Sequence, residues 1–89
     1  MQQRKKDKIT ELDRLISQNF RDMRIKKKVK IAEISQALQV SHQQVNKYDK
    51  GINRISGASL FIIAYILKCN VYDFITNNNI SSNSYSNLK

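Results

Sequence analysis

Apolar residues recur every three or four positions through much of the chain, the spacing that places them on one face of an α-helix. The first stripe predicts a helix over residues 10–27 and consists of Ile9, Leu12, Ile16, Phe20 and Met23. A later stripe predicts a helix over residues 57–68, with a core face of Leu60, Ile63, Ala64 and Leu67. Ser56 is placed to cap that helix, and Asn70 with Asp73 is placed to begin a last short one.

Between these helices, residues 31–51 predict two short helices that meet at a tight corner. Ile31, Ile34 and Leu38 recur at helical spacing in the first of the two. The pair Gln39-Val40 then interrupts the pattern. Two short helices joined in this way form either a plain helical hairpin or a helix-turn-helix.

The second helix of this pair has one apolar face and one polar face. Ser41 is a good N-cap, Val45 and Tyr48 share the apolar face, and Gly51 stands where a helix ends in the left-handed conformation. The polar face has no acidic side chain and consists of His42, Gln43, Gln44, Asn46, Lys47 and Lys50. A short helix of this kind, crossed by another, has the shape that enters a DNA major groove.

These residues resemble the helix-turn-helix of the Xre/lambda-repressor-like family of bacterial and phage regulators. The small, apolar, capping and terminating positions of that motif are matched by Ser35, Val40, Ser41, Val45, Tyr48 and Gly51. Residues 20–24 (FRDMR) resemble the first helix of the family, and residues 53–74 contain matches to its fourth and fifth helices. The resemblance covers residues 13–76 and implies an all-α, five-helix lambda-repressor-like DNA-binding domain.

Charge and composition agree with that fold and add a partner. The 89 residues contain no proline and two glycines, and no apolar–polar alternation marks a strand. The formal net charge is +9 at pH 7, and most Lys and Arg residues lie in the first 30 positions, which favours a polyanion such as double-stranded DNA. We expect a basic disordered arm at residues 1–8, the DNA-binding domain at residues 9–76 and an Asn/Ser-rich disordered tail at residues 77–89. The arm is either a DNA contact or a solvated tail.

Base contacts are expected from the first two turns of the second helix in the motif. His42, Gln43 and Lys47 share a face there, and the matching positions of the resembling repressors reach the major groove. Glutamine can pair bidentately with adenine, and lysine can bind guanine. Gln44 and Asn46 lie at the margins of that face and are candidates for either bases or phosphates.

Phosphate contacts are expected on both sides of this helix. Lys30 lies at the entry to the motif, and the loop after Gly51 offers polar side chains beside backbone N–H groups that we expect to be free. The candidates are Lys30, Ser41, Lys50, Asn53 and Arg54. The alternatives are that the loop is an ordinary polar loop and that the lysines of residues 26–30 only complement the dipole of the first helix.

The resemblance also implies an internal ion pair in which Arg24 turns inward to Asp49 and clamps the first helix to the recognition helix. The chain departs from the family at Ile31, where a glutamine is common. It also departs at three positions where glycine is frequent, which are Lys28, Gln39 and Lys68. If these three backbones are left-handed, each costs about 1 kcal/mol.

The helix over residues 57–68 carries more apolar side chains than its own core needs. Besides the core face, it presents Phe61, Ile62, Tyr65 and Ile66. Small monomers rarely expose such a patch, so we expect it to form a homodimer contact or to bind a protein partner. The alternative is that the N-terminal extension or the tail folds back over it.

The sequence contains no catalytic constellation. One histidine and one cysteine cannot make a zinc site, no Gly-rich phosphate loop is present, and we expect no enzyme activity, cofactor or metal. No stretch approaches 18 apolar residues, so neither a signal peptide nor a membrane span is expected, and the chain is predicted to be cytoplasmic. The function favoured is a sequence-specific transcriptional regulator, most simply a repressor. The alternative is an antitoxin-like interaction module of the same fold with autoregulatory DNA binding.

Overall fold

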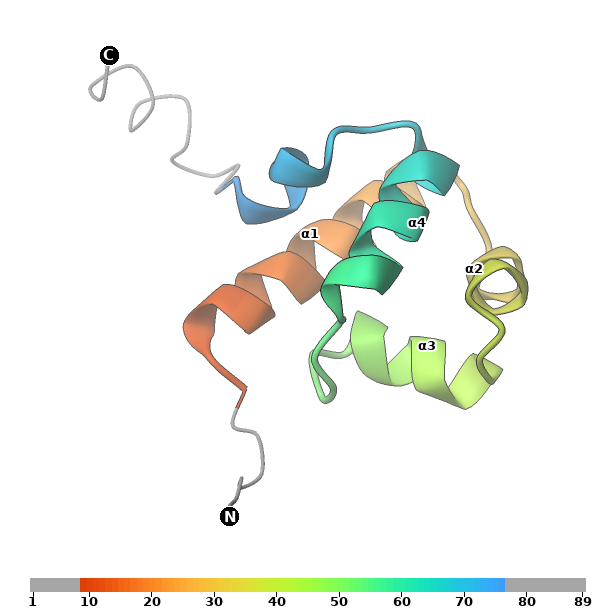
Figure 1. Cartoon of the computed structure of the whole chain (residues 1–89), viewed down its shortest axis with the longest axis horizontal. Coiled ribbons are helices and arrows are strands. Elements are labelled where there is room, and N and C mark those ends of the chain that lie inside the picture. Colours follow the sequence, from red (N-terminus) through yellow and green to blue (C-terminus); the bar gives the residue numbers. More distant parts are fainter. Residues whose placement is uncertain (1–8, 77–89) are drawn as a thin grey trace.

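The computed structural model describes residues 9–76, which form four α-helices and one short 3-10 helix (Figure 1). The elements are α1 (Glu11–Lys26), α2 (Ile31–Leu38), α3 (His42–Asp49), α4 (Gly57–Leu67) and the 3-10 helix η1 (Val71–Ile75). The predicted all-α fold is confirmed. The fifth helix is a single 3-10 segment of five residues, a length at which 3-10 geometry is common. The arm and the tail predicted at residues 1–8 and 77–89 lie outside the described residues.

Side chains cap the beginnings of most of these helices. Thr10 and Asp13 form a capping box at α1, in which each side chain accepts a hydrogen bond from the backbone N–H of the other, at 3.1 and 3.0 Å. Ser41 and Ser56 cap α3 and α4 as predicted, with Oγ–N distances of 3.0 and 3.1 Å. The expected capping box at η1 is present as well, formed by Asn70 and Asp73. Local sequence therefore sets where the helices start.

Left-handed residues end or follow the α-helices. Their φ angles are +60° at Lys28, +59° at Gln39, +74° at Gly51 and +55° at Lys68. Glycine adopts this region without steric cost, whereas the other three residues place a Cβ near a carbonyl oxygen. The three non-glycine positions are thus left-handed, which is the condition under which each was expected to cost about 1 kcal/mol.

All the elements contribute to one core. Each sends in a side chain with no exposed surface, namely Phe20, Ile34, Val45, Ile63 and Phe74. In Figure 1, α4 lies in the middle, with α1 on one side of it and α2 on the other. The first-helix stripe was predicted one turn too long, because Leu12 is 54% exposed and the core covers α1 only beyond its first turn.

Two polar side chains, one in α1 and one at its C-cap, hold the C-terminal elements against this helix. Asn19 is buried, and its Nδ2 donates to the carbonyl oxygens of Phe74 and Thr76, each at 2.7 Å. Lys27 Nζ donates to the carbonyl oxygen of Leu67, one of the unpaired carbonyls at the end of α4. Lys27 therefore complements the dipole of α4 and caps its C-terminus. Neither contact follows from the periodicity of the sequence.

Candidate nucleic-acid interface

The corner between α2 and α3 is built by a left-handed residue followed by a cap. Gln39 turns the chain, and Val40 then donates its N–H to the carbonyl of Ser35 at 3.1 Å while its side chain packs against the core. Ser41 starts α3 directly afterwards. In Figure 1, α2 is seen nearly end-on and α3 lies across the view, so the two helices cross steeply. This is the geometry of a helix-turn-helix.

α3 separates its apolar and polar residues as predicted. Val45 is fully buried and Tyr48 is 7% exposed, so these two side chains fix the inner face. The exposed residues of α3 and its C-cap are His42, Gln43, Asn46, Lys47 and Lys50. Gln44 is half-buried, and its backbone N–H is the group that Ser41 caps. The outer face therefore offers amides, an imidazole and ammonium groups to solvent.

Part of this outer face surrounds a shallow hollow of about 450 Å³. The hollow brings together residues one and two turns apart on α3 and its C-cap with Ile52 of the following loop. Its lining is Gln43, Asn46, Lys47, Lys50 and Ile52. Among the predicted base contacts, Gln43, Asn46 and Lys47 share this hollow, whereas His42 and Gln44 do not line it.

An ion pair joins α1 to the end of α3. Arg24 donates from Nε to Asp49 Oδ1 at 3.1 Å and from Nη2 to Oδ2 at 2.8 Å, with both side chains less than 15% exposed. A third donor, Arg24 Nη1, binds the carbonyl oxygen of Val29 at 3.2 Å. The pair is therefore bidentate and nearly enclosed. Such a pair fixes orientation more than it stabilises, because desolvation offsets most of its Coulomb energy.

The backbone beside α3 differs from what the sequence predicted. The N–H groups expected to be free for phosphates are hydrogen-bonded within the chain: Gly51 donates to Tyr48, and Ile52 and Asn53 both donate to Lys47. That expectation was wrong because the chain continues turning after α3 and uses these donors itself. Lys30 and Lys50 are exposed, and Asn53 is half-buried. Phosphate binding at these positions would thus depend on side chains.

Arg54 points back to the start of α1. Its Nε lies 3.1 Å from Asp13 Oδ2, and its side chain keeps 43% of its surface exposed. Burial tends to raise the pKa of Asp13, but the hydrogen bonds from Thr10 and the charge of Arg54 together hold the pKa below its usual value. The pairing of Arg54 with Asp13 was not predicted from the sequence. Its only local signal is an aspartate three residues after Thr10.

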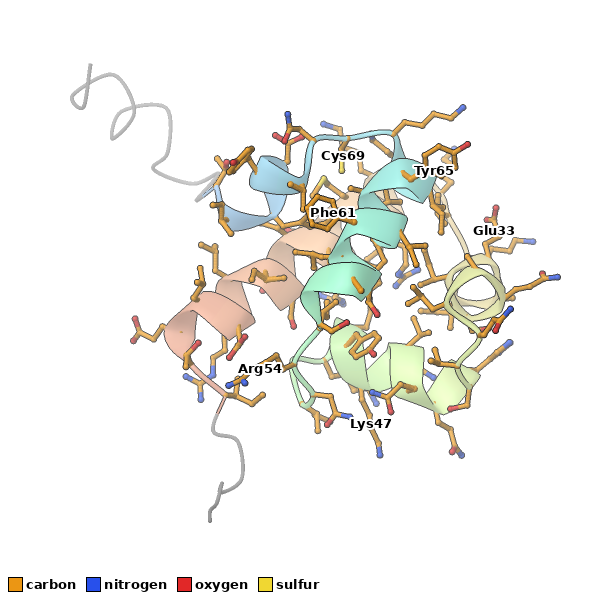
Figure 2. All side chains as sticks on the ribbon, in the orientation of Figure 1. Glu33, Lys47, Arg54, Phe61, Tyr65 and Cys69 are labelled. Carbon is orange, nitrogen blue, oxygen red and sulfur yellow. The ribbon has the colours of Figure 1, made fainter. Side chains whose placement is uncertain are left out.

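The outer face of α4 is smaller than expected. Phe61, Ile62 and Tyr65 are 66%, 41% and 84% exposed. Ile66, assigned to the same patch from the sequence, packs against the core instead, and that assignment is corrected. In Figure 2, Tyr65 lies at the far end of α4 from the side where Lys47 and Arg54 project. The patch Phe61–Ile62–Tyr65 therefore does not coincide with the outer face of α3.

The described part of the chain offers few features that would suit another function, such as a reactive thiol, a metal site or a membrane span. Cys69 packs against the core, where burial and then the charge of Asp73 raise the pKa of its thiol despite the opposing charge of Lys27. Residues 9–76 contain no group of three or more side chains placed to hold a metal ion. Within the same range, no helix combines the length and the apolar character that crossing a bilayer requires.

A steep two-helix corner, with a polar recognition helix clamped to α1, defines a helix-turn-helix domain. The chain belongs to the family of Cro/C1-type HTH DNA-binding domains, which residues 19–78 match. It is also similar to an uncharacterized HTH-type transcriptional regulator of Rickettsia prowazekii, with 38% identity over 68 residues that make up 76% of this chain and 52% of the relative. A regulator of the same description from Rickettsia conorii is 37% identical over 68 residues, again 76% of this chain and 54% of the relative.

The family match confirms the resemblance inferred from the sequence. The aligned part spans about half the length of these curated relatives. No solved structure matches the chain.

Proposed function

We propose that this chain binds double-stranded DNA sequence-specifically as a regulator of transcription, with α3 in the major groove. The observation that carries the proposal is the exposed face of α3, which has several side chains able to read base edges and no carboxylate. The buried residues Val45 and Tyr48 and the Arg24–Asp49 pair support it, because they hold that face outward. The names of the two rickettsial relatives support the regulatory role.

The roles of individual side chains follow from their chemistry. Gln43 and Lys47 are proposed to read bases, since a glutamine amide can pair with adenine and a lysine can bind guanine. His42 and Asn46 extend the same face, and Gln44 contributes from its margin. The cations Lys30, Lys50 and Arg54, with Ser41 and Asn53, are proposed to face phosphates and to release counterions.

The proposal is tested by selecting bound duplexes from a random pool and then measuring affinity by fluorescence anisotropy. Gln43→Ala is expected to cost about 1–3 kcal/mol on the selected site and little on random DNA. The matched control is Gln36→Ala, which removes an exposed amide of α2 and should change neither affinity. Equal losses on both DNAs would make Gln43 a backbone contact. Failure to enrich any sequence would overturn the proposal.

Repression by occupancy is the simplest mode of action for a domain of this kind. A reporter whose promoter overlaps the selected site should lose output when the chain is expressed. Increased output would indicate activation instead. One such domain offers a modest interface, so two copies on a two-fold site are expected to give useful specificity.

A second candidate is an antitoxin-like module that holds a protein partner and uses DNA binding for autoregulation. The exposed patch Phe61–Ile62–Tyr65 favours it, since such patches mark interaction sites. Native purification of the chain with a stoichiometric second protein, abolished by Phe61→Asp, would support this role. A self-associating chain without a second protein would favour the regulator alone.

A further inference from the structure

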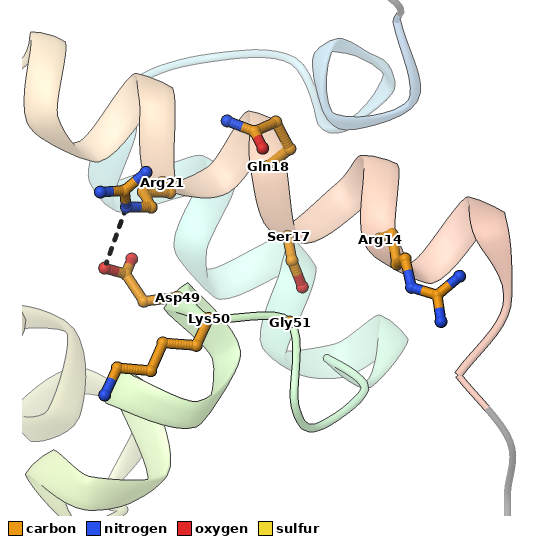
Figure 3. A pocket seen from close by; sticks show the side chains of 7 residues that line it. All are labelled: Arg14, Ser17, Gln18, Arg21, Asp49, Lys50 and Gly51. Atoms are coloured by element: carbon orange, nitrogen blue, oxygen red, sulfur yellow. Dashed lines mark ion pairs between the residues drawn. The ribbon is translucent and has the colours of Figure 1, made fainter.

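A cleft separates the outer face of α1 from the C-terminal end of α3. It has a volume of about 540 Å³ and is lined by Arg14, Ser17, Gln18, Arg21, Asp49, Lys50 and Gly51. Figure 3 shows Arg21 and Lys50 at one end of this cleft and Arg14 at the other. The cleft is distinct from the hollow on the outer face of α3, and none of the α1 residues that line it belongs to the site described above.

The positive charges of the cleft are not fully neutralised by neighbouring acidic side chains. Within residues 9–76, the side chains of Arg14 and Lys50 form no hydrogen bond or ion pair, and both are exposed. Arg21 approaches Asp49 only to 3.9 Å, beyond hydrogen-bond distance, and its side chain is 52% exposed. The carboxylate of Asp49 is already bound by two nitrogens of Arg24. The cleft therefore presents uncompensated positive charge.

The lining indicates which anion fits. Small-molecule sites are mostly lined by apolar and aromatic side chains. The lining of this cleft contains no apolar or aromatic side chain. Arg14 and Arg21 lie two helical turns apart, roughly 10 Å along the axis. That spacing suits an extended backbone with several phosphates better than one small anion. Arginine is also the side chain best matched to phosphate oxygens.

The cleft adjoins the proposed recognition surface. Lys50 lines both the cleft and the hollow that contains Gln43 and Lys47. A duplex whose bases lie on α3 would therefore carry its backbone past Lys50 toward α1. We propose that the cleft holds DNA backbone phosphates flanking the bases read by α3, with Arg21 and Lys50 at one end and Arg14 at the other. The inference rests on the proposed function and extends the footprint to α1.

The test compares Arg14→Gln, Arg21→Gln and the double variant on the selected duplex. Each single change should lower the slope of log K against log salt by about 0.9, on specific and random DNA alike, without changing the preferred sequence. Lys68→Gln is the control, because it removes one charge at the C-terminal end of α4, which is the end of that helix away from α3 (Figure 1). Arg14→Gln removes no hydrogen bond or ion pair between described residues, and circular dichroism checks the fold of every variant.

A second measurement locates the phosphates. Neutral methylphosphonates placed singly along the flanks should weaken wild-type binding at one or two positions and have no further effect on the double variant. Slopes for the arginine variants equal to that of Lys68→Gln would overturn the cleft assignment while leaving the proposed function intact. Thermal protection of wild type by millimolar inorganic phosphate, lost in the double variant with unchanged DNA slopes, would assign the cleft to a small anion and also overturn it. Absence of any DNA binding by wild type would instead defeat the proposed function.

Discussion

Asp49 is the residue through which the orientation of α3 depends on α1. Both of its carboxylate oxygens accept from Arg24, and only 12% of its side chain is exposed. An enclosed charge of this kind is costly when it loses its partner, because it keeps the cost of desolvation without the hydrogen bonds that offset it. The other cation beside it, Arg21, lies 3.9 Å away, beyond hydrogen-bond distance. The pair therefore makes α3 sensitive to changes at a position that need not touch DNA.

Removing one member of the pair should consequently cost more than removing both. Asp49→Ala is expected to lower the free energy of unfolding by about 3–5 kcal/mol, whereas Arg24→Met with Asp49→Met should lose much less. Urea denaturation measures both. A double variant as unstable as the single one would show that the pair contributes net stability. The double variant should bind DNA with reduced discrimination, since α3 then lacks its charged clamp.

The lowered pKa of Asp13 predicts that the stability of the fold depends on pH. Its pKa is lowered in the folded chain, so its contribution is fully present above the pKa of the unfolded chain and is lost as pH falls through the folded value. The difference in the free energy of unfolding between wild type and Asp13→Asn should therefore narrow as the pH falls through and below 3.8, the ordinary pKa of an aspartate. Introducing Arg54→Gln into both proteins should also make this difference in unfolding free energy smaller, because Arg54 helps to hold the pKa of Asp13 down. If this difference in unfolding free energy did not change with pH, Asp13 would not contribute to the loss of stability in acid.

At the scale of the elements, most of the fold could be predicted from sequence because stripes and caps are local. Phe20, Val45 and Tyr48 were predicted to face inward from spacing alone, and all three are buried. Ile66 could not be assigned in this way. It lies on a flank of the α4 core stripe opposite Phe61, and a helical wheel gives the two flanks equal weight. Only the packed structure covers the flank of Ile66 and leaves Phe61 in solvent.

The turn between α2 and α3 is a point where the chain accepts strain. Gln39 has a φ of +59°, a region that glycine occupies at no steric cost. Gln39→Gly is expected to raise the free energy of unfolding by up to about 1 kcal/mol. The control is Gln36→Gly, inside α2, which should lower it by about 1 kcal/mol. A loss of stability in Gln39→Gly would mean that its side chain compensates the backbone cost.

For the molecule as a whole, the candidate site was only partly predictable. The polar face of α3 is local in sequence, so its residues were identified correctly as exposed, apart from the half-buried Gln44. The cleft was not predictable, since it depends on α1 and the end of α3 meeting across more than 25 residues of chain. Likewise, the pairing of Arg54 with Asp13 follows from the packing of the loop on α1.

The whole molecule is expected to self-associate through α4. The patch Phe61–Ile62–Tyr65 is exposed on α4, and a two-fold contact would cover it on both copies. We expect wild type to dimerise at micromolar concentration and Ile62→Asp to remain monomeric in sedimentation equilibrium. Gln36→Asp, with the same new charge on α2, should still dimerise. A wild type that stays monomeric both free and on DNA would exclude the contact.

The hydrogen bonds of Asn19 also decide how the chain can be handled in the laboratory. They hold the backbone at Thr76 against the middle of α1, while the Asp13–Arg54 pair holds the start of α1 beside the loop that follows α3. A dye attached at the end of η1 would thus lie on the side of α1 away from α3 (Figure 1). A dye attached at Thr10 would instead lie near the Asp13–Arg54 pair, next to the surface proposed for DNA. Attachment at η1 is therefore the choice that keeps α3 accessible to a duplex.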